Sequence, residues 1–197
     1  MLISDDYRVL QEQLHIAKPK TYGVSGSQWS KKVLDLARAF KCESILDYGC
    51  GKQTLHKALI ETDYGPEGRN PWSNGGFQNY DPCIEGLDMP PDPADLVVCG
   101  DVLEHVEPDC LEDVLDDLAR LAKKIFFGVV ATGPAAKHFP DGSNLHIIQE
   151  PMVWWIERLG PPRFHYPGIK DRGDEFVYIG YSSELAATMT QGDEKDA

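Results

Sequence analysis

The chain has 197 residues, a length that suits one domain with its own hydrophobic core and is short for two. Its 42% hydrophobic and 26% charged residues exclude wholesale disorder, and no run of about 18 apolar residues predicts a membrane-spanning helix. The formal net charge of −13 disfavours nucleic acid as a partner, because an acidic surface repels phosphate backbones.

The cysteines and the N-terminus bear on the compartment. Five cysteines without a Cys-x-x-Cys pair indicate reduced thiols and no zinc–cysteine site. The first residues are acidic, whereas a signal peptide begins with basic ones. We therefore expect a cytoplasmic protein that does not bind membranes. Nothing in the pattern predicts its oligomeric state.

Three parts of the chain are expected. Residues 1–28 are predicted to form a helix over 5–16 followed by a loop. A main domain is expected over residues 29–190, and an acidic tail over 191–197 is expected to fray.

Strands and helices are predicted to alternate in the main domain. The helices, which show apolar residues at helical spacing, are expected at 27–40 with Ser27 as the cap, 53–61, 108–122 and 151–159. The strands are expected at 44–47, 77–80, 94–99 and 125–130, with edge strands at 163–166 and 175–181. Long loops are expected at 63–76 and 131–150. This order predicts a single-domain, doubly wound α/β sheet with helices on both faces, which binds ligands where the strands end.

A glycine turn, residues 47–51, follows the first strand of the main domain. It does not fit a phosphate-binding P-loop, because Gln53 stands where Ser or Thr is needed, and the dinucleotide fingerprint needs a glycine where Thr54 stands. A carboxylate before the glycines, Asp47, suits a ligand with an ammonium group, such as S-adenosylmethionine. Asp81 ends the next strand and is placed to accept hydrogen bonds from two ribose hydroxyls. A turn that merely connects strand to helix remains the alternative at this point.

Three segments together, residues 45–52, 80–82 and 101–106, resemble the class I S-adenosylmethionine-dependent methyltransferases, and the likeness covers about residues 29–160. The resemblance implies a Rossmann-like sheet, a bound S-adenosylmethionine and methyl transfer to a nucleophile. Two departures are the loss of the usual third glycine at Gln53 and a stretch between Asp81 and Ala94 too short for the usual helix plus strand. By the same resemblance the residues that contact the cofactor are Asp47, Gly49, Cys50, Gly51, Asp81, Asp88, Met89, Gly100 and Asp101, with Asp88 and Met89 at the adenine.

A group of carboxylates and histidines resembles a more specialised site. Asp101-x-x-Glu104-His105, with a later His146, is similar to the motif of metal-dependent small-RNA 2′-O-methyltransferases. That resemblance implies a divalent metal held by Asp101, Glu104, His105 and His146. Mixed carboxylate and imidazole ligands suit manganese, iron or zinc better than magnesium. In the alternative, no metal binds and the histidine packs at the start of a helix.

Without a metal, a histidine can act as the general base, since imidazole titrates near neutral pH. The candidate catalytic residues are His146, His138 and Asp101. We expect methyl transfer to an oxygen or nitrogen atom of a small-molecule or sugar-like acceptor. The alternatives are metal-assisted 2′-O-methylation of RNA and a non-catalytic module that binds S-adenosylmethionine.

Overall fold

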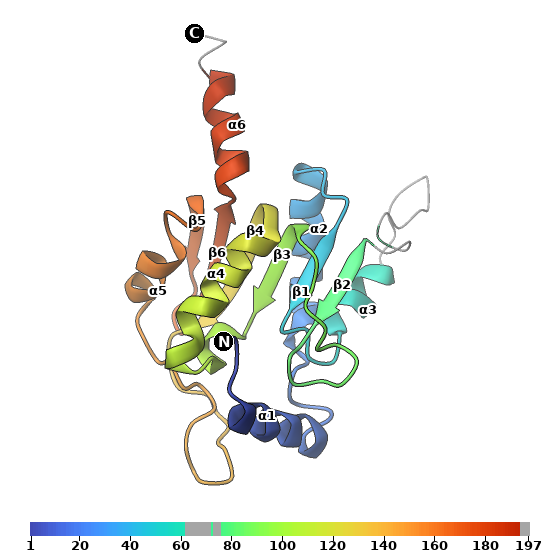
Figure 1. Cartoon of the computed structure of the whole chain (residues 1–197), viewed down its shortest axis with the longest axis vertical. Coiled ribbons are helices and arrows are strands. Elements are labelled where there is room, and N and C mark those ends of the chain that lie inside the picture. The colour runs from blue at the N-terminus through green and yellow to red at the C-terminus, as the bar shows by residue number, and fades with distance from the viewer. Residues whose placement is uncertain (62–71, 73–75, 194–197) are drawn as a thin grey trace.

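A six-stranded sheet forms the centre of the computed structural model, which describes residues 1–61, 72 and 76–193 (Figure 1). Its strands lie in the order β2-β1-β3-β4-β6-β5. The first four are parallel, and β6 is antiparallel to both β4 and β5. The bounds are β1 Ile45–Tyr48, β2 Phe77–Tyr80, β3 Ala94–Gly100, β4 Ala122–Ala131, β5 His165–Asp171 and β6 Glu175–Tyr181.

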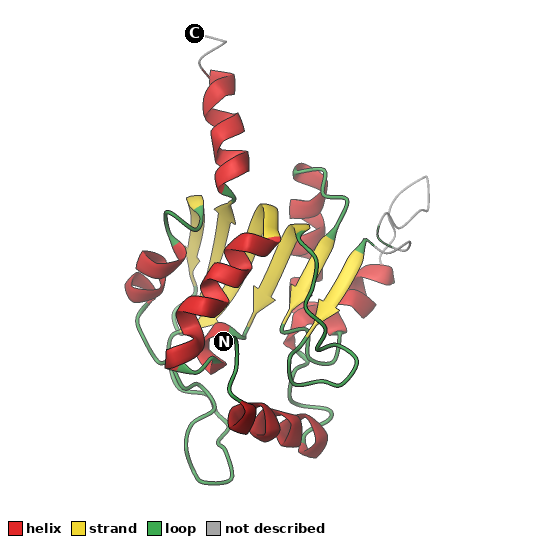
Figure 2. Cartoon of the chain, in the orientation of Figure 1, coloured by secondary structure: helices red, strands yellow, loops and turns green. Residues whose placement is uncertain are grey.

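Helices cover both faces of the sheet, as predicted (Figure 2). Successive side chains of a strand point to opposite faces, so Ile45 packs on one side with α2 and α3, and Leu46 packs on the other with α4 and α5. The central segments 96–99 of β3 and 125–130 of β4 are apolar because both faces of the sheet are covered there. The doubly wound α/β fold is therefore confirmed. The helices are α2 Ser30–Ala39, α3 Thr54–Ile60, α4 Leu111–Leu121 and α5 Met152–Leu159.

Two details of the predicted elements are wrong. Ser27 does not cap the helix before the first strand, because a 3₁₀ turn, η1 (Ser25–Trp29), precedes α2, and Trp29 is the capping residue without a side-chain hydrogen bond. The edge strand expected at 163–166 extends over 165–171 instead, because its residues pair with β6 as far as Asp171.

A helix that the pattern did not predict follows the last strand. α6 (Ser183–Asp193) extends away from the sheet (Figure 1), and the Ser182 hydroxyl accepts a hydrogen bond of 3.2 Å from the backbone N–H of Leu185. Ser182 before Glu184 was a usable helix-start signal. Residues 191–193 of the expected tail belong to α6, while residues 194–197 and most of the expected loop at 63–76 lie outside the described residues.

Helix α1 (Asp5–Ala17) lies beneath the edge of the sheet where the parallel strands end (Figure 1). Ser4 caps it by accepting a hydrogen bond of 3.2 Å from the backbone N–H of Tyr7. Leu14 packs with Phe139 and Leu145 from the long loop at 131–150, so that helix and loop meet below the sheet. No helix in the described part of the chain is long and apolar enough to cross a membrane.

Candidate functional site

A cavity of about 620 Å³ opens at the carboxyl edge of the parallel strands, between the sheet, α1 and the 131–150 loop. Open α/β sheets bind ligands at this edge. The predicted site residues that line the cavity are Gly49, Gly51, Asp81, Asp101, Glu104, His105 and His146. Residues far apart in the sequence thus meet in one space large enough for a small ligand.

The glycine turn after β1 has a geometry that requires glycine. Gly49 and Gly51 have φ values of +76° and +50°, in the left-handed region that L side chains rarely adopt. A Cβ on Gly51 would lie 2.5 Å from the backbone oxygen of Gly23, so no side chain fits there. Gln53, at the usual place of a third glycine, also has a positive φ of +57°. The turn therefore keeps the left-handed backbone even where glycine has been replaced.

Asp81 is fixed beside this turn by backbone donors. Its Oδ2 accepts a hydrogen bond of 3.0 Å from the N–H of Gly51, and its Oδ1 accepts one of 3.0 Å from Cys83. A carboxylate has about four lone-pair positions, so Asp81 keeps the capacity to accept further bonds from a ligand in the cavity. Its place at the end of β2 fits the predicted contact to ribose.

Asp47 lies at the end of β1 but behind the cavity wall. Only 6% of the residue is exposed, and burial together with the nearby Asp81 carboxylate raises its pKa to about 7. A cation in the adjacent cavity would oppose both effects, because an opposite charge favours the ionised carboxylate.

Several other predicted residues lie away from the cavity. Cys50 and Gly100 adjoin it in sequence but do not line it. Asp88 and Met89 are exposed, and the Asp88 carboxylate accepts a hydrogen bond of 3.2 Å from the N–H of Gly86. No helix or strand forms between β2 and β3, as the short spacing predicted. The adenine contact proposed for Asp88 and Met89 remains a prediction without support from the cavity lining.

Of the three predicted catalytic residues, two line the cavity. His138 is exposed and lies outside the lining, in a bridge with Asn144. Asp101 lines the cavity with a positive φ of +56°, and among the described residues its carboxylate has no hydrogen-bond partner. Strained backbone of this kind costs on the order of 1–3 kcal/mol and is concentrated at functional sites.

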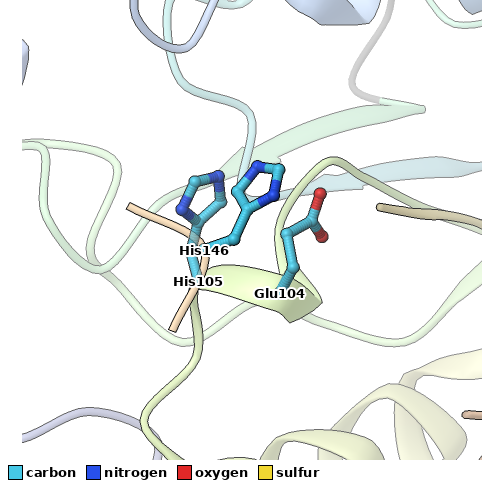
Figure 3. Close-up of side chains that lie close together, drawn as sticks. All are labelled: Glu104, His105 and His146. Carbon is cyan, nitrogen blue, oxygen red and sulfur yellow. The ribbon is translucent and has the colours of Figure 1, made fainter. Parts of the chain in front are cut away.

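Glu104, His105 and His146 form a compact cluster (Figure 3). The first two belong to the short 3₁₀ helix η2 (Leu103–His105) after β3, and the third comes from the 131–150 loop. One potential ligand atom from each residue lies within 4.8 Å of the others. Asp101, the fourth predicted ligand, is not part of this group.

Each member of this cluster is held by the backbone. The Nδ1 of His105 lies 2.7 Å from the carbonyl oxygen of Leu145, and the Nδ1 of His146 lies 2.7 Å from that of Gly133. A carbonyl only accepts, so each Nδ1 carries a proton, and Nε2 is the nitrogen of each ring left for a ligand. Glu104 Oε1 accepts a hydrogen bond of 3.2 Å from the N–H of Ala131.

The electrostatics of the cluster fit a cation. Glu104 is fully buried, and among the described residues its Oε2 has no partner. Burial raises the pKa of Glu104 to about 8 and lowers that of His105 to about 4, so both side chains are neutral at pH 7. Imidazoles oriented by backbone carbonyls through Nδ1, next to an unpartnered carboxyl oxygen, are a donor set that suits a divalent metal. The residues therefore fit the predicted metal.

Helix α1 contributes cavity residues that the sequence pattern did not identify. Tyr7, Gln11 and His15 line the cavity from one face of α1, and Tyr22 joins them from the following loop. The Tyr7 hydroxyl donates a hydrogen bond of 2.7 Å to the backbone oxygen of His105. Polar residues at positions 7, 11 and 15 share a helix face, and this spacing of four was the available signal.

These residues form a connected wall. The Gln11 amide donates to the Tyr7 hydroxyl and accepts from the Tyr22 hydroxyl. The Tyr22 ring packs edge to face against both His15 and His105. The cavity is thus closed on one side by residues outside the expected main domain.

Comparisons with known proteins identify the fold. No protein-family model and no curated protein matches the sequence. Among solved structures, magnesium protoporphyrin IX methyltransferase from Synechocystis PCC 6803 with bound SAM has a TM-score of 0.58 and 14% identity, with 91% of this chain and 99% of that chain covered. An O-methyltransferase family protein from Burkholderia thailandensis has a TM-score of 0.55 and 15% identity, over 88% of this chain and 62% of that chain.

A third solved structure has a similar TM-score. The methyltransferase domain of bacterial CtHen1-C has a TM-score of 0.55 and 10% identity, over 79% of this chain and 97% of that chain. This chain spans less than two thirds of the length of the Burkholderia protein but nearly all of the other two. The fold implied by the resemblance of residues 45–52, 80–82 and 101–106 is therefore confirmed: the chain has the fold of the class I S-adenosylmethionine-dependent methyltransferases.

Proposed function

We propose that this chain transfers a methyl group from S-adenosylmethionine to an oxygen or nitrogen atom of a small-molecule or sugar-like acceptor. The observation that best supports this proposal is the cavity at the carboxyl edge of the sheet. The glycine turn and Asp81 line it together with Asp101, His105 and His146, so cofactor-type and acid–base residues share one space.

S-adenosylmethionine, when bound, supplies an electrophilic methyl group. The protein's own part is to orient the reactants and exclude water. Asp81 is placed to accept hydrogen bonds from ribose hydroxyls, and the buried Asp47 suits a nearby ammonium group. Helix α1 and the 131–150 loop line the cavity and restrict its contact with bulk water.

His146 is the preferred general base. Its Nδ1 is anchored on Gly133, so its Nε2 lone pair is the free acceptor for a proton from the attacking atom. His105 is less suited, because burial lowers its pKa to about 4 and makes it a weak base. Of the two histidines, His146 is therefore the better candidate for the general base.

The size and charge of the cavity support a small acceptor. A volume of about 620 Å³ lies in the range of small-molecule sites and must hold both the cofactor and the acceptor. The net charge of −13 continues to disfavour an extended nucleic acid. The five cysteines are all free and buried, which supports the expected reducing, cytoplasmic surroundings.

Metal-assisted 2′-O-methylation of RNA is the second candidate, and the cluster of Glu104, His105 and His146 favours it. In that function these residues would hold a divalent metal that lowers the pKa of the acceptor hydroxyl. The third candidate, a non-catalytic cofactor-binding module, rests on Gln53 and on the short connection between β2 and β3.

Calorimetric titration with S-adenosylmethionine and S-adenosylhomocysteine, with and without EDTA, is the first test. We expect micromolar binding that Asp81→Asn weakens, followed by turnover in a screen of small acceptors. Folded protein that binds neither ligand at millimolar concentration would contradict the proposal. Binding without turnover of any acceptor favours the non-catalytic module, and turnover lost with EDTA and restored by manganese favours the metal-assisted reaction.

A further inference from the structure

His15 of α1 lies beside Asp81, whose carboxylate is predicted to bind the ribose of the cofactor. Its side chain is only 9% exposed, it lines the cavity, and its Nε2 lies 3.9 Å from Oδ2 of Asp81. The imidazole is held between Tyr22, with ring centroids 4.9 Å apart, and the backbone of Gly23. Among the described residues its Nδ1 is buried without a hydrogen-bond partner. A buried imidazole fixed in this way requires an explanation.

The separation between His15 and Asp81 suits one bridging atom. At 3.9 Å the two polar atoms are too far apart for a direct hydrogen bond. An oxygen placed about 2.8 Å from both atoms completes a triangle with ordinary hydrogen-bond lengths. A hydroxyl is both donor and acceptor, so it can donate to the carboxylate and accept from the imidazole. A phosphate fits poorly here because it would face the Asp81 carboxylate.

The protonation state of His15 agrees with this arrangement. Burial lowers its pKa and the Lys52 ammonium acts in the same direction, while the Asp81 carboxylate opposes them. The neutral ring carries one N–H. Nε2 faces a carboxylate and Nδ1 faces no acceptor, so the proton belongs on Nε2.

We propose that His15 is a cofactor-binding residue which, together with Asp81, holds one ribose hydroxyl of S-adenosylmethionine. This inference rests on the proposed function, since it requires the cofactor to lie in the cavity. His15 also connects helix α1 to the glycine turn at residues 47–51. Its backbone oxygen accepts a hydrogen bond of 3.1 Å from Lys52 Nζ, and Gly23 accepts one of 2.7 Å from the Lys52 N–H. A ribose hydroxyl held between His15 and Asp81 would add one more contact between α1 and the sheet.

The test compares S-adenosylhomocysteine with its 2′-deoxy and 3′-deoxy analogues by calorimetry on the full chain. For the natural protein, removing the bridging hydroxyl should weaken binding about tenfold or more, because two buried hydrogen bonds are lost. His15→Leu should weaken S-adenosylhomocysteine binding about tenfold and leave binding of the analogue without that hydroxyl nearly unchanged. His15→Gln, which keeps an N–H donor of similar reach, should retain most of the affinity.

Tyr22→Phe is the matched control, because it removes a hydroxyl of the same wall that donates its hydrogen bond to Gln11 and not to Asp81. It should leave the preference for the ribose over the deoxyribose analogues unchanged. If His15→Leu does not fold, His15→Asn replaces it, since its amide is too short to reach the hydroxyl. An equal loss of affinity for all three ligands would overturn the proposal, because His15 would then only support the fold. Absence of any binding by the natural protein would instead count against the proposed function itself.

Discussion

His105 and His146 lie edge to face, with ring centroids 4.9 Å apart, although one follows strand β3 and the other belongs to the 131–150 loop. Each ring is oriented by a backbone carbonyl of that same loop, Leu145 for His105 and Gly133 for His146. The loop therefore supplies one histidine and orients both. Its conformation decides whether the cavity contains a general base, a metal site or both.

The first prediction concerns the metal. Addition of Mn²⁺ or Zn²⁺ to the protein should raise its melting temperature, because a ligand that binds only the folded chain stabilises it. Glu104→Gln and His146→Ala should each reduce this gain, since each removes one of three grouped ligands. The measurement is a thermal melt with increasing metal. His165→Asn, on strand β5, is the control and should behave like the natural protein. A gain that both cluster variants retain in full would count against the metal site.

The second prediction concerns His146 in catalysis. With an acceptor identified by screening, His146→Ala should lower kcat about 100-fold or more and change cofactor affinity little, as expected for loss of a general base. Transfer of labelled methyl groups gives kcat, and calorimetry gives the affinity for S-adenosylhomocysteine. Unchanged turnover would exclude the role as a base.

The third prediction concerns stability and pH at Asp47. Its folded pKa of about 7 exceeds the ordinary value of 3.8. Below about pH 4 the carboxyl is protonated in both states, whereas between pH 4 and 7 it ionises mainly in the unfolded chain. Its contribution to stability therefore falls as pH rises and levels off above about 7. Asp47→Asn should remove this loss and stabilise the ligand-free protein at pH 8 by at most about 4 kcal/mol.

Urea unfolding at pH 5 and pH 8 checks the Asp47 prediction. The difference in stability between the variant and the natural protein should be larger at pH 8. A difference that shrinks as pH rises would show that the folded pKa is not raised.

The fourth prediction separates backbone strain from steric fit in the glycine turn. Gly51 and Gly86 both have positive φ, but a Cβ meets the oxygen of Gly23 only at Gly51 and nothing within 4 Å at Gly86. Gly86→Ala should cost about 1 kcal/mol of stability from strain alone. Gly51→Ala should cost more and also weaken S-adenosylhomocysteine binding, because it displaces the N-terminal segment from the turn. Chemical unfolding measures the loss of stability, and calorimetry measures the affinity for S-adenosylhomocysteine. Equal losses in the two variants would contradict the steric role of Gly51.

The sequence by itself determined the framework of the fold. The segment 96–99 of β3 is continuously apolar because both faces of a parallel sheet are covered, and the glycines of residues 49–51 are needed where the chain turns sharply after β1. These features are local, so they can be read from neighbouring residues. The positions of Asp81 and Asp101 followed from the rule that parallel strands end at the same edge.

Only the tertiary structure decided how helix α1 closes the site, whereas the grouping of His105 with His146 was already implied by the resemblance to the metal-dependent enzymes. Helix α1 carries no recognisable motif. The spacing of Tyr7, Gln11 and His15 shows that they share a helix face, but it does not show what this face covers. The 131–150 loop has no periodicity, so its contact with η2 depends on packing across the whole domain. Long-range contacts of this kind bring His146 beside His105 and His15 beside Asp81, whereas His138, in the same loop, stays exposed.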